Sequence, residues 1–152
     1  MDVLKRTFRG ATCRVGPAPG SKHGVLEVLT FGPLFDETYI YFREFVLAAI
    51  SGAPAVVVRL DTVLDAMTAP PRIDDQIYTA ENSPPQAVVL RVGSRMDLWQ
   101  EHADEMGTRG VVRALFLPHE ADMAYRFAEV AAAHRVNGPK LSRRVGSDPA
   151  RL

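Results

Sequence analysis

The sequence predicts an α/β fold with a mostly parallel, five-stranded mixed sheet, an N-terminal antiparallel hairpin and about four helices. The run from Ala55 to Leu60 carries three valines in succession without alternation, which is typical of a strand buried on both faces. Residues 86–92 and 111–117 have the same character. Stretches with helical spacing separate these strands, and this alternation favours parallel pairing with right-handed crossovers.

Two segments near the N-terminus predict the hairpin. Residues 6–15 partly alternate between apolar and polar side chains, and we interpret them as a strand with one solvent-facing side, bulged at Gly10. Residues 25–31 predict a second strand, which Gly32 and Pro33 end. The short, turn-like connection between the two strands favours antiparallel pairing.

Four stretches predict helices. The first begins at Asp36, whose carboxylate suits an N-cap, and its apolar stripe consists of Tyr39, Phe42, Phe45, Val46, Ala49 and Ile50. The second is short and follows the prolines at positions 70 and 71. The third follows Ser94 and buries Trp99. The last opens at Pro118, and its predicted buried side consists of Met123, Phe127, Val130, Ala131 and His134.

The length and composition predict one domain in a reducing compartment. We assign residues 1–136 of the 152 to a single domain and residues 137–152 to a basic, flexible tail. Cys13 is the only cysteine, so no intrachain disulfide can form. No apolar run is long enough to span a membrane, and no apolar segment follows the charged first residues. We therefore expect a cytoplasmic protein without a membrane span.

The formal net charge is zero, but the charges are segregated along the chain. Residues 1–23 carry five basic side chains against one acidic, and residues 137–152 carry four against one, so the body between them is acidic. Basic ends could contact nucleic acid or anionic lipid. They are spread out and contain no aromatic platform for bases. We therefore expect solvated termini, or termini that touch the body or a neighbouring subunit, and no nucleic-acid partner.

Residues 61–85 form the candidate functional segment. This stretch follows a buried strand, has no clear periodic pattern and carries the acids Asp61, Asp65, Asp74, Asp75 and Glu81. Loops after the strands of an open α/β sheet commonly carry the working groups. Four aspartates could bind Mg²⁺ or Ca²⁺, but their spacing matches no calcium loop, and a solvated acidic loop is the better interpretation. The sequence predicts no catalytic residue, no metal site and no cofactor.

Three stretches carry a resemblance to a known family. Residues 30–39 (TFGPLFDETY) are similar to a strand that enters a helix, and residues 87–99 (AVVLRVGSRMDLW) to a strand-to-helix passage that ends on tryptophan. Residues 112–127 are similar to the closing strand and helix. In these stretches the chain resembles the STAS-like superfamily, and in particular its bacterial SpoIIAA-like (STAS/SEC14-type) branch.

The resemblance implies a non-enzymatic regulatory or protein-binding module. Sigma-regulating STAS domains are phosphorylated on a serine in an Asp-Ser-Ser-Gly-like motif, whereas the matching stretch here, Asp61 to Pro71, contains no serine. Thr68 carries the hydroxyl nearest to the predicted helix, and we expect it to be an N-cap or turn residue. We expect a protein partner, with a homodimer left open, and a binding loop that contains Asp61, Asp65, Thr68, Asp74 and Asp75.

A second hypothesis is a protein that binds a small apolar ligand or lipid. It follows from the SEC14-type branch of the resemblance and from the aromatic stripe of the first helix. The candidate lining residues are Tyr39, Phe42 and Phe45. Stripes at this spacing more often belong to the core than to a ligand cavity.

Overall fold

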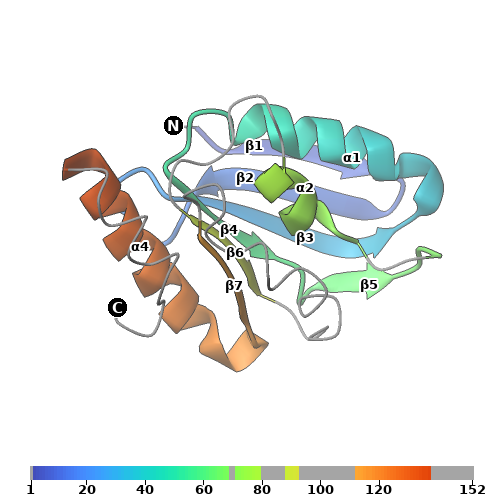
Figure 1. Cartoon of the computed structure of the whole chain (residues 1–152). Helices are drawn as coiled ribbons and strands as arrows, with labels where there is room; N and C mark the ends of the chain where they lie inside the picture. The colour runs from blue at the N-terminus through green and yellow to red at the C-terminus, as the bar shows by residue number, and fades with distance from the viewer. Residues whose placement is uncertain (1, 69–70, 80–87, 93–111, 138–152) are drawn as a thin grey trace.

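The computed structural model describes residues 2–68, 71–79, 88–92 and 112–137, and all statements below concern these residues. They form an α/β fold around one mixed sheet of seven strands (Figure 1). The strand order is β1-β2-β3-β4-β6-β7, and β5 pairs with β3 beside this path. Helices pack on both faces of the sheet. The expected α/β class with a mixed sheet is therefore confirmed.

The strands fall into an antiparallel and a parallel half. The antiparallel half consists of β1 (Leu4–Phe8), β2 (Ala11–Pro17) and β3 (Leu26–Leu34). Parallel pairing then runs from β3 to β4 (Ala55–Arg59), β6 (Val88–Val92) and β7 (Val112–Phe116), and from β3 to β5 (Val63–Asp65). β4 lies between β3 and β6, so the valine-rich run is an inner strand of the sheet.

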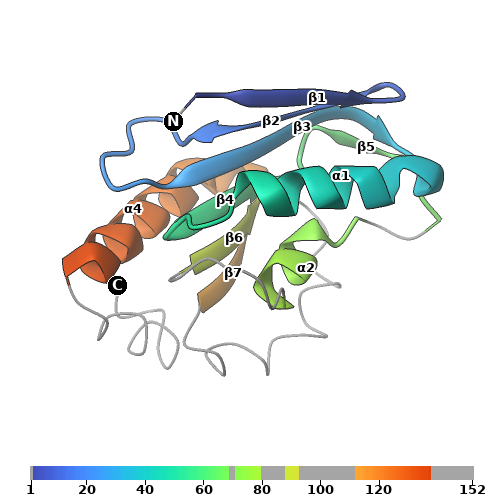
Figure 2. The same ribbon diagram turned by 90° about the horizontal axis from the view of Figure 1, so that it is seen from above.

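Three helices accompany the sheet in the described part of the chain. They are α1 (Asp36–Ala49), α2 (Ile73–Thr79) and α4 (Ala121–Asn137), the last preceded by a 3-10 turn at Pro118–Glu120. In Figure 2, α1 lies along one side of the strands β1 to β3. The helix predicted after Ser94, with Trp99, lies outside the described residues.

Residues 6–15 were predicted as one bulged strand, and this prediction is wrong. Arg9 and Gly10 have φ angles of 42° and 98° and form a two-residue turn that folds the segment into the hairpin β1–β2. Positive φ at both central positions is what the tight hairpin turns require, and glycine adopts it without strain. This turn and the short strand β5 raise the strand number from the predicted five to seven.

β3 does not end at Gly32 and Pro33, contrary to the prediction. Gly32 has a φ of 91°, and a Cβ atom on it would lie 2.4 Å from the carbonyl oxygen of Gly10. Glycine is therefore the residue that lets β3 pass the hairpin turn and continue to Leu34. The continued stretch supplies the edge to which β5 adds.

Two separate clusters of buried side chains enclose the sheet. Alternate residues of β4 serve them: Val56 and Val58 belong to the cluster under α1, and Ala55 and Val57 to the cluster under α4. All four are buried. The double burial predicted for this strand is therefore confirmed.

The buried stripe of α4 differs in part from the predicted one. Ala131 is buried and Phe127 is partly buried, as predicted, whereas Met123 and Val130 are 56% and 44% exposed and His134 is exposed. The other residues that face the sheet are Ala124, Ala128 and Ala132. Side chains of one carbon let a helix backbone lie close to a sheet, so the alanines rather than the large residues set this contact. The described part of the chain contains no helix that could cross a membrane.

Candidate functional site

The start of the candidate segment is fixed to the end of β3. The Thr62 hydroxyl donates to the carbonyl oxygen of Thr30 at 2.5 Å, and the Gly32 N–H donates to the carbonyl oxygen of Thr62 at 3.3 Å. β5 then pairs in parallel with β3, with Leu64 opposite Pro33. Three residues of strand give too few alternations to be predicted from the sequence.

The other end of this stretch is tied to the first turn of α1. The N–H and hydroxyl of Thr68 donate to the Asp36 carboxylate at 3.1 and 2.5 Å. Asp36 was predicted as the N-cap of this helix, but Phe35 occupies that position without a side-chain cap. The carboxylate of Asp36 instead holds Thr68, so residues 62–68 are anchored at both ends.

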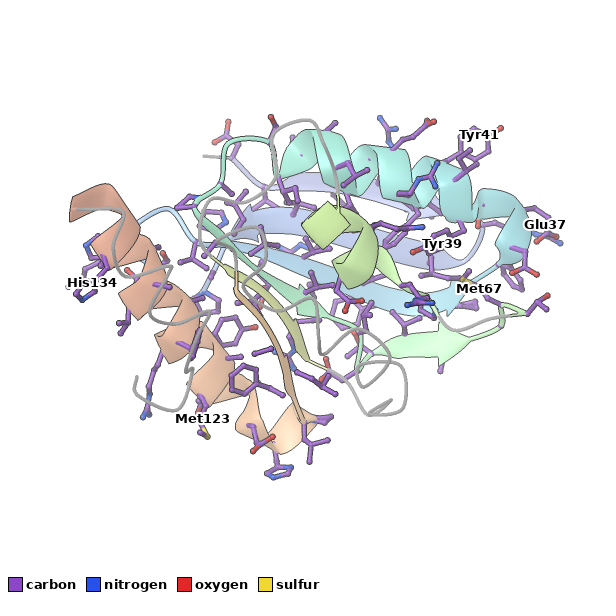
Figure 3. The ribbon with its side chains drawn as sticks, in the orientation of Figure 1. Glu37, Tyr39, Tyr41, Met67, Met123 and His134 are labelled. Carbon is purple, nitrogen blue, oxygen red and sulfur yellow. The ribbon has the colours of Figure 1, made fainter. Side chains whose placement is uncertain are left out.

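Between these anchors the chain presents an exposed apolar side chain. Leu64 is 64% exposed. Phe31 precedes Gly32, the first residue of β3 that pairs with β5, and is 45% exposed. Ala66, Thr68 and Asp36 are also exposed, where this stretch meets the start of α1. We call these five residues the β5 surface. Figure 3 shows the neighbouring Glu37 and Met67 together at this end of the molecule, away from Met123 and His134 on α4.

The predicted acidic residues differ in how they are placed. Asp74 is only 3% exposed, on α2. Asp61 is held by Arg59, whose Nε and Nη2 donate to its two oxygens at 2.9 and 2.7 Å. The side chains of Asp65 and Asp75 lie outside the described part. Of the five predicted binding residues, Thr68 is the one whose described side chain is exposed.

Asp61 belongs to a polar network that the sequence did not predict, which we call the tyrosine network: Glu27, Arg59, Asp61 and Tyr125. The Tyr125 hydroxyl donates to Glu27 and accepts from Arg59 Nη1 at 2.9 Å. The network joins β3, the end of β4 and α4. Arg59 and Asp61 are two residues apart, a spacing that places side chains on one face of an extended chain.

The charges of this network are mutually stabilised. The hydrogen bond from Arg59 holds the pKa of Asp61 below its usual range, and the hydrogen bond to Asp61 raises the pKa of Arg59. Burial, with the hydrogen bond to Glu27, raises the pKa of Tyr125 to about 12. Arg59 therefore stays cationic, Asp61 stays anionic and Tyr125 stays protonated at neutral pH. These states suit a fixed structural link between the sheet and α4.

The three aromatic residues proposed to line a ligand cavity have different surroundings. Phe42 is fully buried, with its ring centroid 5.9 Å from that of Phe8. The Tyr39 hydroxyl donates to Gln76 at 2.8 Å and accepts from the Arg72 N–H at 3.2 Å. Phe45 lines an open groove of about 390 Å³ between β1 and α1. Tyr39 and Phe42 are not among the residues lining that groove.

The described residues contain neither a group that could hold a metal ion nor an exposed cysteine. Among the described residues, no group of three or more His, Cys, Asp or Glu side chains could hold a metal ion. Cys13 is buried, and burial raises the pKa of its thiol to about 11, so it is a thiol rather than a thiolate at neutral pH. Comparisons with protein-family models, curated proteins and solved structures found no match.

Proposed function

We propose that this chain is a non-enzymatic regulatory or protein-binding module of the STAS-like type, without the phosphorylated serine motif. Its partner binds at the β5 surface. The supporting observation is Leu64, a largely exposed leucine on a strand that hydrogen bonds fix at both ends. A backbone segment that is already fixed loses little conformational entropy on association, which favours binding.

The position of this surface agrees with the proposal. The β5 surface follows the inner strand β4 and adjoins the end of β3, and this edge of an open α/β sheet commonly carries the binding groups. Thr68 lies where the STAS-like resemblance sets the regulatory hydroxyl. Its hydroxyl donates to Asp36, and a phosphate there would face that carboxylate at close range. The proposed module therefore works by steady binding rather than by phosphorylation of Thr68.

Fewer residues of the acidic loop are proposed to contact the partner than the sequence predicts. Asp61 and Asp74 support the fold rather than face a partner, because one is paired with Arg59 and the other is buried. Contact falls instead on Leu64 and Phe31, with Asp36 at the rim. We place the module in the cytoplasm, which is compatible with its single, buried cysteine.

Affinity capture from the native host tests the proposal. The full chain is compared with Leu64→Asp and with the matched control Met123→Asp, which changes an equally exposed side chain on α4. We expect a protein that the wild type and Met123→Asp retain and that Leu64→Asp loses. Capture that Leu64→Asp leaves intact, or that no variant shows, contradicts the proposal.

The apolar-ligand hypothesis stays a second proposal, and its specific support is Phe45 in the groove beside β1. Native mass spectrometry of the protein purified from cells distinguishes the two. The protein-binding module gives the mass of the bare chain. A retained small molecule that Phe45→Ala releases supports ligand binding instead.

A further inference from the structure

Among the strands of the described residues, β1 is an edge strand, and one side of its backbone pairs with none of them. It pairs with β2 alone, in the register Phe8 to Ala11, Thr7 to Thr12 and Arg6 to Cys13. In a hairpin with a two-residue turn, the pair that flanks the turn exchanges both hydrogen bonds, and every second pair then does the same. Lys5 and Thr7 fall between those pairs, so their N–H and C=O groups point to the free edge.

The free edge runs beside an apolar groove. The groove of about 390 Å³ lies between β1 and α1 and is lined by Leu4, Arg6, Tyr41, Glu44, Phe45, Ala48 and Ala49. Most of this lining is apolar, and Leu4 and Tyr41 are largely exposed. A strand added next to β1 would direct every second side chain towards α1 and into this groove. Backbone and groove together therefore offer both parts of a strand-addition site.

The charge of the edge selects the occupant. Lys5 and Arg6 on β1 are exposed and carry positive charge, and the Arg6 guanidinium lies 5.1 Å from the centre of the Phe45 ring. Glu44 is the acidic residue of the groove lining. Because Lys5 and Thr7 face the free edge, an antiparallel pair of two β1 strands centred on Lys5 or on Arg6 would place Lys5 opposite Lys5 or Arg6 opposite Arg6. Like charges directly opposite each other destabilise a strand pair, so a second copy of this chain is disfavoured.

We propose that the free edge of β1 binds an extended acidic segment of another protein by strand addition, with apolar side chains at alternate positions in the groove. Carboxylates of that segment face Arg6 on the groove side and Lys5 on the opposite side of the sheet, because neighbouring residues of a strand point to opposite faces. Lysines on an edge strand also discourage unwanted pairing with other strands. The groove beside β1 would still let the edge bind a segment with matching apolar and acidic side chains. The site involves β1 and the second half of α1, so it does not rest on the proposed function of the β5 surface.

Selection from a displayed library of random short peptides, with the full chain as bait, tests the proposal. We expect enriched peptides to be acidic, with apolar residues at alternate positions. The enriched peptide is then synthesised and titrated against Thr7→Pro, which removes an edge N–H, and against Arg6→Glu. Each variant should weaken binding at least about tenfold. Enrichment of peptides without acidic residues, or no enrichment, overturns the proposal.

Two further variants keep the test independent of folding. Ala48→Glu changes an exposed side chain of α1 that lines the groove, and it should also weaken binding without altering the melting temperature. Arg126→Glu is the matched charge control, because Arg126 is exposed on α4, which packs against β4 and β6 and away from β1. It should bind as wild type. Binding that survives Ala48→Glu overturns the proposal, as does a dimer in sedimentation that Thr7→Pro dissolves. Loss of binding in Leu64→Asp would assign the peptide to the β5 surface instead.

Discussion

The two faces of the sheet are covered by helices in different ways. Under α1 the buried side chains are large, with Phe8, Phe42, Leu34 and Ile50 in one cluster. Under α4 the buried side chains of the helix are four alanines, and Tyr125 and Phe127 pack beside them partly buried. Large side chains stabilise by the apolar area they bury, whereas alanines bury little area but allow close approach. The sheet therefore holds α1 mainly through the apolar area that large side chains bury, and α4 mainly through the close approach of the helix backbone.

Polar contacts compensate on the α4 face. The tyrosine network joins α4 to β3 and β4. One turn further along, Glu129 accepts hydrogen bonds from the Ser21 hydroxyl at 2.7 Å and the Lys22 N–H at 2.8 Å, and its carboxylate lies 2.6 Å from the His23 ring. These contacts are directional, so they fix where α4 lies along the sheet. A helix with a small apolar contact can thus be positioned by hydrogen bonds at its margins.

Phe42→Ala should produce the largest loss of stability, because it removes a fully buried ring from the α1 face. Truncation of a buried phenylalanine costs about 3–5 kcal/mol. Chemical denaturation measures the change. Tyr41→Ala, at a neighbouring exposed position, is the control and should stay within about 0.5 kcal/mol of wild type. Equal effects of the two variants would remove the distinction between buried and exposed sides of α1.

Tyr125→Phe should cost less, about 1.5–3 kcal/mol, because hydrogen bonds to charged groups have that magnitude. The variant keeps the ring but removes the hydroxyl shared by Glu27 and Arg59. Unfolding in urea measures the difference. A variant as stable as wild type would mean that the tyrosine network does not help to hold α4.

Ala128→Leu tests the close approach itself. Overpacking a tight contact costs about 1–3 kcal/mol, and Ala128 is completely buried against the sheet. Val130→Leu is the matched control on the exposed side of the same helix and should be nearly neutral. If Ala128→Leu instead raises the melting temperature, the α4 face contains space that the close-approach account excludes.

The smallest effect is a pH dependence at Glu129. Partial burial alone would raise its pKa, but the hydrogen bonds from Ser21, Lys22 and His23 outweigh it and hold the pKa below the usual range. A lowered pKa stabilises the fold above the pKa of the unfolded chain, and this contribution is lost as the pH falls through the folded value. Between about pH 5 and pH 3, wild type should lose more stability than Glu129→Gln. Parallel curves for the two proteins would contradict this assignment.

The sequence predicts the elements whose signal is local. The valine run predicts that β4 is buried on both faces of the sheet, and buried Val57 confirms it. The apolar stripe predicts that α1 is buried on one side, and buried Phe42 confirms it. The predicted stripe of α4 is right for Ala131 but wrong for Met123 and Val130, which are exposed, whereas Ala124 and Ala128 are buried in their place. The size of a side chain is a poor sign of burial where a helix lies close to a sheet, because only small side chains fit there.

The candidate site was predictable only in its place along the chain. Residues after β4 do form an exposed surface, but β5 depends on Gly32 passing the hairpin turn, a contact with distant Gly10. The tyrosine network joins Glu27 to Tyr125, which lie far apart in the sequence, and no local sequence pattern predicts such a pair. The spacing of Arg59 and Asp61 was the one local sign that Asp61 has a partner within the fold.

Hydrogen exchange of the full chain, with and without its captured partner, shows which residues the partner covers. We expect added protection in residues 31–38 and 62–68, which contain the β5 surface and its anchors, and little change in α4. Protection confined to α4 or to β1, with residues 62–68 unchanged, would contradict the claim that this partner binds at the β5 surface.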